Sequence, residues 1–185
     1  MESTVIKETK QKMEKTVEHL KKELGKVRSG RASASLLDDI KVDYYGSLMP
    51  ITQLATISIP EPRLILIQPW DASSIPAIEK AILKSELGIT PSNDGKVIRL
   101  AIPQLTEERR KELIKLAKKI CEENKIAIRN ERRDAIERIK AEEKNKTISE
   151  DDSKRLQKEI QEITDSYIKK IDEIMTLKEK EILVI

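Results

Sequence analysis

The chain has 185 residues, a length that allows one compact domain or two small ones. Charged residues make up 37% and aromatic residues 2%, but the formal net charge is only +3, so a nucleic-acid surface could only be a local patch. One cysteine excludes an intramolecular disulfide, and no apolar run approaches the roughly 18 residues of a membrane span. The first residues also lack the apolar region of a signal peptide. These features predict a soluble protein of the cytoplasm without a membrane partner.

A long helix is expected at the start of the chain. Apolar side chains recur in alternating steps of four and three from Met13 to Val27, and Ile6 extends the series backwards. This spacing places them along one stripe of a helix, as in the a/d seam of a bundle. The helix is expected to end near Gly30, where a linker begins.

Residues 31–104 differ from the sequence on both sides. All seven prolines lie between Pro50 and Pro103, and charged residues fall to about one in five here, against about one in two elsewhere. β-rich stretches bounded by turn signals predict strands at residues 40–46, 55–59, 63–69 and 97–103. A helix is expected at residues 73–88, with Gly88 placed to end it. The segment is therefore predicted to be a small α/β domain.

The rest of the chain predicts two more long helices. One is expected at residues 106–144, and the other begins with the capping box at residues 149–152. The apolar residues of the first include Leu113, Leu116, Ile120, Ala127 and Ile128. Those of the second are Leu156, Ile160, Ile163, Tyr167, Ile174 and Leu177. The turn at residues 145–147 is short, so the two helices should be antiparallel neighbours.

The predicted fold class is α+β with two domains. No one of the three amphipathic helices can bury its apolar stripe alone, so together they predict an elongated antiparallel three-helix bundle. This bundle is discontinuous, because residues 1–30 and 105–185 form it and residues 31–104 are inserted between them. Two short linkers, near residues 30–31 and 103–105, would join the domains at one place and act as hinges.

A few arginines lack acidic neighbours on their own helix. Most basic residues have a carboxylate three or four residues away, as Arg133 has Glu137, which is typical of a solvated face. Arg129, Arg132 and Arg28 have none. Either acids from other helices pair with them, or they face water, or they bind an anionic partner. Because a guanidinium fork matches phosphate and aromatic residues are few, an anionic partner would be RNA recognised by its shape and phosphates.

An enzyme has little support in this sequence. His19, the only histidine, lies on a charged helix, and no further histidine exists to activate Cys121. There is no Walker-type loop, no dinucleotide fingerprint and no Cys/His set with metal-ligand spacing. Trp70 is expected in the core or on the domain surface. We therefore expect no catalytic residue, metal ligand or cofactor; the alternative of an enzyme would need its site in the inserted domain.

Several stretches resemble the ribosome recycling factor family. KVRSGRASASLLDDIKVDYYG (26–46) resembles the end of its first helix and its hinge, and IAIRNERRDAIERIK (126–140) resembles its arginine-bearing helix. Three further stretches match, namely SELGITPSNDGKVIRL (85–100), PQLTEERRKELIK (103–115) and ISEDD (148–152). The resemblance covers essentially the whole chain in order. One departure is Ala34, where the family often has proline, so the path into the second domain should be slightly less rigid.

The resemblance implies a three-helix bundle with a smaller β/α/β domain set at an angle, giving an L-shaped molecule like a tRNA. It also implies a monomeric, non-enzymatic factor of protein biosynthesis that acts after translation termination. With elongation factor G, and GTP hydrolysis on that partner, such a factor splits the ribosome into subunits and releases mRNA and tRNA. The bundle would contact mainly large-subunit ribosomal RNA.

Individual residues can be carried over from the same resemblance. Those that match the RNA-contacting motifs are Arg28, Arg31, Arg129, Asn130, Arg132 and Arg133. The hinge is expected at Ser29, Gly30, Arg31, Pro103, Gln104 and Leu105. A generic coiled-coil RNA-binding protein, like the arms appended to synthetases, is the alternative. It would bind isolated RNA as well as ribosomes and would not split subunits.

Overall fold

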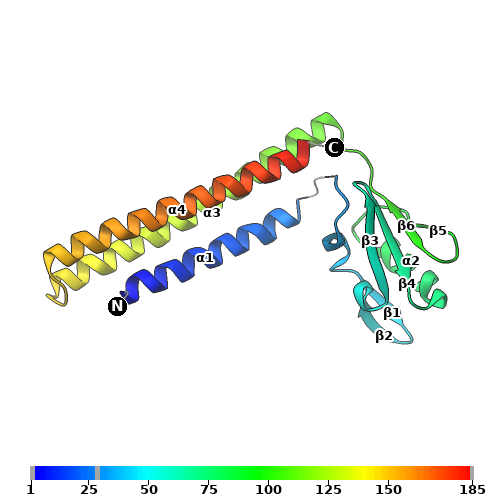
Figure 1. Ribbon diagram of the computed structural model, residues 1–185, viewed down its shortest axis with the longest axis horizontal. Coiled ribbons are helices and arrows are strands. Elements are labelled where there is room, and N and C mark those ends of the chain that lie inside the picture. The colour runs from blue at the N-terminus through cyan, green and yellow to red at the C-terminus, as the bar shows by residue number, and fades with distance from the viewer. Residues whose placement is uncertain (1–2, 28–29, 184–185) are drawn as a thin grey trace. The chain divides into compact units, whose positions relative to one another are not determined.

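The computed structural model describes residues 3–27 and 30–183 (Figure 1). Two of the predicted site residues, Arg28 and Ser29, lie outside these ranges. None of the described helices has the length and apolarity that crossing a membrane requires.

The described residues form two compact units, each with its own core. Residues 3–27 and 110–183 make up a helical unit, and residues 30–109 make up a mixed unit. On the C-terminal side the division falls within the first turn of a helix that begins at Glu107. The α+β class predicted from the sequence is confirmed.

Three long helices build the helical unit: α1 (Thr4–Gly25), α3 (Glu107–Lys144) and α4 (Glu150–Leu183). After a short turn, α4 runs back along α3, and α1 lies beside them (Figure 1). The predicted seam of α1 is buried from Ile6 to Val27. At one end of the bundle all three helices share a cluster of buried residues: Val5, Ile6, Ala135, Ile139, Leu156 and Ile160.

The seam predicted for α4 is wrong in its second half. Leu177 is 67% exposed, and Ile174 is only half-buried. Ile171, which was not predicted as a seam residue, is fully buried. A strict seven-residue repeat drifts by about 20° per heptad on a straight helix, so the buried stripe leaves the heptad positions in a helix this long.

Thr164 illustrates the same shift at the middle of α4. It is buried where the apolar pattern had placed its neighbour Ile163, which is half-buried. The threonine hydroxyl donates a hydrogen bond to the carbonyl of Ile160 at 2.8 Å, so its polar group is satisfied inside the core. A sequence pattern that counts only apolar residues cannot detect such a position.

The predicted stripe of α3 is correct only in part. Leu113 and Ile128 are buried, but Leu116 is 45% exposed. Cys121 and the polar Asn124 are buried instead. The side-chain amide of Asn124 donates to the Ile120 carbonyl at 2.8 Å, which explains how a polar residue is tolerated there.

The mixed unit contains two antiparallel sheets and one helix. The first sheet is the hairpin of β1 (Lys41–Tyr44) and β2 (Ser47–Pro50). The second has the strand order β3-β4-β6-β5. Its strands are β3 (Ala55–Glu61), β4 (Leu64–Pro69), β6 (Ile98–Ala101) and β5 (Ser92–Asn93). Helix α2 (Ile75–Lys84) and three short 3-10 helices (Ala34–Leu37, Ile51–Gln53 and Ala72–Ser74) complete the unit.

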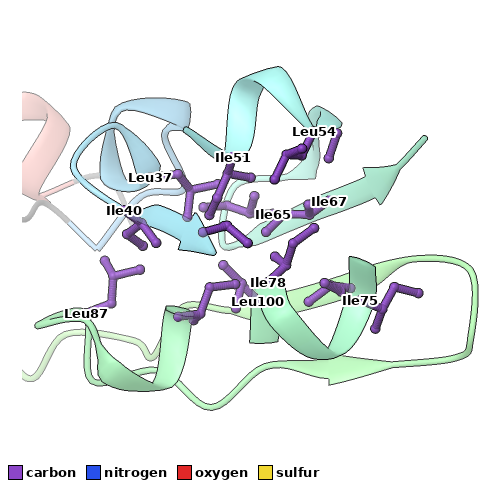
Figure 2. Close-up of a cluster of buried hydrophobic side chains, with 14 residues drawn as sticks. Leu37, Ile40, Ile51, Leu54, Ile65, Ile67, Ile75, Ile78, Leu87 and Leu100 are labelled. Atoms are coloured by element: carbon purple, nitrogen blue, oxygen red, sulfur yellow. The ribbon is translucent and has the colours of Figure 1, made fainter. Parts of the chain in front are cut away.

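The core of this unit lies between α2 and the strands (Figure 2). Ile75 and Ile78 of the helix face Ile65 and Ile67 of β4, and Leu100 of β6 joins them. Alternation along β4 places every second side chain in this core, as expected for a sheet with one covered face. The unit therefore buries a core without any side chain from the bundle.

Several elements of the mixed unit differ from the sequence prediction, which did not include strand β5 or the 3-10 helices Ala34–Leu37 and Ile51–Gln53. The hairpin strand β2 was missed, because its turn at Tyr45 and Gly46 has none of the usual Asn-Gly or Asp-Gly signal; both residues nevertheless have positive φ, 49° and 84°. Helix α2 ends at Lys84 and not at Gly88. Ser85 ends it, since both its backbone N–H and its hydroxyl bond to the Ile82 carbonyl.

The register of α4 can be tested by two truncations. Ile171→Ala removes a fully buried side chain and should lower the free energy of unfolding by about 2–5 kcal/mol. Leu177→Ala removes a side chain that is 67% exposed and should change it by less than about 0.5 kcal/mol. Denaturant unfolding measures both. A larger loss for Leu177→Ala than for Ile171→Ala would restore the heptad register predicted from the sequence.

Candidate nucleic-acid interface

The outward face of α3 carries a group of polar residues around one exposed apolar residue. Arg129, Asn130 and Arg133 follow Ile126 by three, four and seven residues, so the four residues share one side of the helix. All four are exposed, whereas Ile128 is buried on the opposite side. We call this group the α3 outer face. Packing of α3 against the other two helices leaves this side to solvent.

Arg132 lies at the edge of this face and contacts α4. Its side chain is half-buried, and its Nη1 donates a hydrogen bond to Oε1 of Gln161 at 3.0 Å. The Nε2 of Gln161 in turn donates to Oδ1 of Asp165 at 2.8 Å. This partner is neutral and lies on another helix, so the spacing of acids along α3 does not reveal it. The pairing of α3 with α4 is what brings it into contact.

Arg129 has an acidic partner on its own helix, at a spacing that the sequence analysis did not consider. Its Nη1 lies 3.4 Å from Oε1 of Glu122, seven residues earlier. The two side chains are 51% and 58% exposed, so this ion pair contributes little to stability. Among the described residues, no acid from another helix pairs with Arg129 or Arg132.

The sequence prediction for Arg133 is wrong in one respect. It was expected to be compensated by Glu137, but within the described ranges no carboxylate lies within 4.0 Å of Arg133. The opposite holds for Arg138, which pairs with Glu8 of α1 and has Glu142 at 3.9 Å. In the described part of the chain, Arg133 of the outer face therefore lacks the carboxylate contacts that Arg138 has.

The remaining predicted RNA-contacting residue, Arg31, belongs to the mixed unit. It is exposed, and no ion pair involves it in the part of the chain that the structure describes. The structure thus gathers Arg129, Asn130, Arg132 and Arg133 on one helix and places Arg31 on the other unit.

The linker residues are held by the turn between β3 and β4. The N–H of Ala32 donates to the carbonyl of Pro62 at 2.7 Å, and the N–H of Ile102 donates to the carbonyl of Arg63 at 2.8 Å. One turn therefore fixes both ends of the chain that enter this unit. Gly30, two residues before the anchored Ala32, has φ of 77°, a backbone conformation that favours glycine.

The groups considered for an enzyme show no reactive arrangement. Burial raises the pKa of the Cys121 thiol to about 11, so it is neutral at physiological pH, and its sulfur lies 3.5 Å from that of Met175. His19 is exposed and lies 2.7 Å from Glu23. Trp70 is also exposed, and its indole N–H donates to Thr56. Across residues 3–27 and 30–183, no group of three His, Cys, Asp or Glu side chains could hold a metal ion.

Glu131 is a half-buried carboxylate between α1 and α3. Its Oε1 accepts a hydrogen bond from the Thr16 hydroxyl at 2.7 Å, and its Oε2 has no partner. Burial raises the pKa of Glu131 above its ordinary 4.5, although the bond from Thr16 and the charge of Lys12 oppose the change. Glu131 therefore faces α1, away from the outer face on which its neighbour Asn130 lies.

The fold and this surface together define a class of protein: a helical bundle that has an inserted α/β unit and carries arginines on the outer face of α3. Residues 20–183 match the family model described as "Ribosome recycling factor". The chain belongs to the ribosome recycling factor family.

Relatives and solved structures agree over almost the whole chain. A ribosome-recycling factor of Carboxydothermus hydrogenoformans is 60% identical over 179 residues, 97% of each chain. A solution structure of a ribosome recycling factor is 49% identical, with a TM-score of 0.78 over 98% of this chain and 96% of that one. A second structure is 45% identical, with a TM-score of 0.66 over 97% of each chain. It is described as models of the T. thermophilus factor and E. coli elongation factor G bound to the E. coli post-termination complex.

The raised pKa of Glu131 predicts a pH-dependent effect of Glu131→Gln. Below about pH 4.5 the carboxyl is protonated in both the folded and the unfolded state, and its contribution to stability is fully present. As the pH rises through the folded pKa, the folded state must ionise a half-buried group, and that contribution is lost. The neutral variant avoids this loss, so its stability relative to the wild type should increase between pH 4 and pH 7.

Denaturant unfolding of both proteins at the two pH values measures the difference. Glu122→Gln, at a more exposed carboxylate of the same helix, serves as the control and should show a smaller change. A stability difference between Glu131→Gln and the wild type that is the same at pH 4 and pH 7 would contradict the expectation.

Proposed function

We propose that this protein binds the ribosome after translation termination and splits it into subunits, so that mRNA and tRNA are released for a new round of initiation. Its partner would be elongation factor G, which would hydrolyse GTP during the splitting. The observation that carries the proposal is the α3 outer face, with Arg132 at its edge, in a chain of this family. The relative bound to a post-termination complex with elongation factor G supports the same reading.

Ribosomal RNA is the anion that best fits the α3 outer face. Arg129, Arg132 and Arg133 present guanidinium forks with donors that match phosphate oxygens in pairs. Asn130 adds an amide that can bond to phosphate or ribose. The exposed apolar Ile126 could pack against a ribose or base. Recognition would therefore rest on RNA shape and backbone and would be mainly to large-subunit RNA.

The bundle would act as a stiff lever on the ribosome. Helix α3 has 38 residues and so is about 57 Å long at 1.5 Å per residue. Contacts with α1 and α4 along its length resist bending, as in other antiparallel bundles. A force applied at one end would therefore be transmitted to the other end.

The hinge would allow the mixed unit to turn while the bundle stays bound. The β3–β4 turn holds Ala32 and Ile102. Rotation would therefore occur at the proposed hinge residues, 29–31 and 103–105. A force that elongation factor G exerts on the mixed unit would then move this unit as one rigid body. Such a factor would act as a monomer in the cytoplasm, and it would bind and move its partners without catalysing a reaction.

Subunit splitting of post-termination ribosomes, with and without elongation factor G and GTP, tests the proposal directly. We expect light scattering to fall only when both factors are present. Binding to isolated RNA without any splitting would instead identify a generic coiled-coil RNA-binding protein.

Replacing Arg132 should weaken binding without unfolding the protein. Arg132→Ala removes a charge-assisted contact to phosphate and should raise the Kd for ribosomes about tenfold. It should also reduce the slope of log Kd against log salt concentration by roughly one, because one counterion fewer is released. The melting temperature should change little, since the one hydrogen bond of this side chain among the described residues is to the exposed Gln161.

Arg138→Ala is the matched control for that experiment. Arg138 lies on the same helix, but Glu8 and Glu142 already compensate it, so ribosome binding should be nearly unchanged. If Arg132→Ala lowered the melting temperature and left binding intact, the role of Arg132 would be structural.

Stiffening one linker should separate binding from splitting. Gln104→Pro places two prolines in succession after the anchored Ile102, which restricts rotation of the backbone there. The α3 outer face is unchanged, so the Kd for ribosomes should stay within about twofold of wild type. The rate of splitting with elongation factor G should fall, while Gln104→Ala should split normally. Wild-type splitting by Gln104→Pro would show that rotation at this linker is not needed.

A further inference from the structure

We propose that Gln161 of α4, held by Asp165, is a positioning residue that fixes Arg132 in the orientation that binds RNA phosphate. This rests on the proposed function, because it assumes that Arg132 contacts RNA. It extends the candidate interface to a second helix that carries none of the predicted RNA-contacting residues.

The two hydrogen bonds that link Arg132, Gln161 and Asp165 allow only one assignment of donors and acceptors. Arginine can only donate, so it must meet the carbonyl oxygen of the Gln161 amide, at 3.0 Å. The carboxylate of Asp165 can only accept, so it must meet the amide nitrogen, at 2.8 Å. Both ends of the amide are therefore assigned, and Gln161 cannot rotate away without losing a bond to each neighbour.

A neutral partner holds the arginine without cancelling its charge. Two other basic residues of α3 meet neighbouring helices through acids: Lys125 pairs with Asp172 of α4, and Arg138 pairs with Glu8 of α1. At Arg132 the corresponding position is an amide. One of the five guanidinium N–H groups is used, and the remaining donors and the full positive charge stay available.

The geometry also reduces the entropy that binding would cost. A free arginine side chain has many rotamers and loses them when it binds a phosphate. Arg132 is half-buried and already bonded to Gln161, so fewer rotamers remain to be lost. Arg133 has neither a carboxylate within 4.0 Å nor a buried side chain in the part of the chain that the structure describes. Arg132 is therefore better organised in advance than its neighbour.

Asp165 completes the arrangement from one turn further along α4. Its carboxylate orients the amide but does not touch the guanidinium in the structure, where Gln161 lies between them. The acid thus stabilises the arginine indirectly, through the polarised amide, and does not occupy the donors that a phosphate would need.

The test compares variants in ribosome binding over a series of salt concentrations. Gln161→Ala removes the bond to Arg132 but leaves its charge, so the Kd should rise roughly two- to tenfold with an unchanged salt slope. Gln161→Glu places a carboxylate against the guanidinium, so the Kd should rise and the slope should fall by roughly one, as in Arg132→Ala. Gln157→Ala is the control, because Gln157 also lies on α4 but donates to Ser153 and not to an arginine; it should bind like the wild type.

A double variant shows whether Gln161 acts through Arg132. Arg132→Ala combined with Gln161→Ala should bind no more weakly than Arg132→Ala alone, because the residue being positioned is already absent. Additive losses, or a Gln161→Ala variant that binds like the wild type while Arg132→Ala binds weakly, would overturn the positioning role and leave the proposed function intact. If Arg132→Ala itself bound ribosomes as tightly as the wild type, Arg132 would not contact RNA. That result would contradict both the positioning role of Gln161 and the interface in the proposed function.

Discussion

The packing of α3 against both α1 and α4 is the constraint on which the candidate interface depends. Side chains that face α1 bond to it, as Glu131 does to Thr16, and side chains that face α4 bond to that helix, as Arg132 does to Gln161. Only the third side of α3 is left to solvent. On that side Arg133 has no carboxylate within 4.0 Å among the described residues, whereas Lys125, Arg132 and Arg138 each meet a partner from another helix.

For a basic residue of α3 that contacts another helix, the kind of partner decides whether its positive charge is neutralised. An acid, as for Lys125 with Asp172, neutralises the charge and ties two helices together. An amide, as for Arg132 with Gln161, ties the helices but preserves the charge. On the proposed function, stability and anion binding would thus depend on different partners on the same helix. This distinction explains how an arginine-rich stretch can form part of a packed bundle and still present a cationic surface.

Sequence periodicity worked best where the buried stripe is short and apolar. Every residue predicted for the α1 seam is buried, since the buried positions from Ile6 to Val27 are almost all apolar; only the polar Thr9 was missed. In α4 the stripe drifts from the heptad and includes Thr164, so Leu177 was misplaced. The β1–β2 hairpin was missed for a different reason: Tyr45 adopts positive φ although tyrosine gives no signal for it.

By itself the sequence determined the α+β class, the discontinuous order of the helical segments and the family, because these depend on composition, local periodicity and motifs along the chain. It also showed that Arg129 and Arg132 have no acid within one turn of their own helix. Only the tertiary structure decided the partners: Glu122 two turns away for Arg129, Gln161 on α4 for Arg132, and no carboxylate within 4.0 Å of Arg133 among the described residues. Long side chains reach across two turns and between helices, and helix packing sets those distances, which spacing along the chain does not encode.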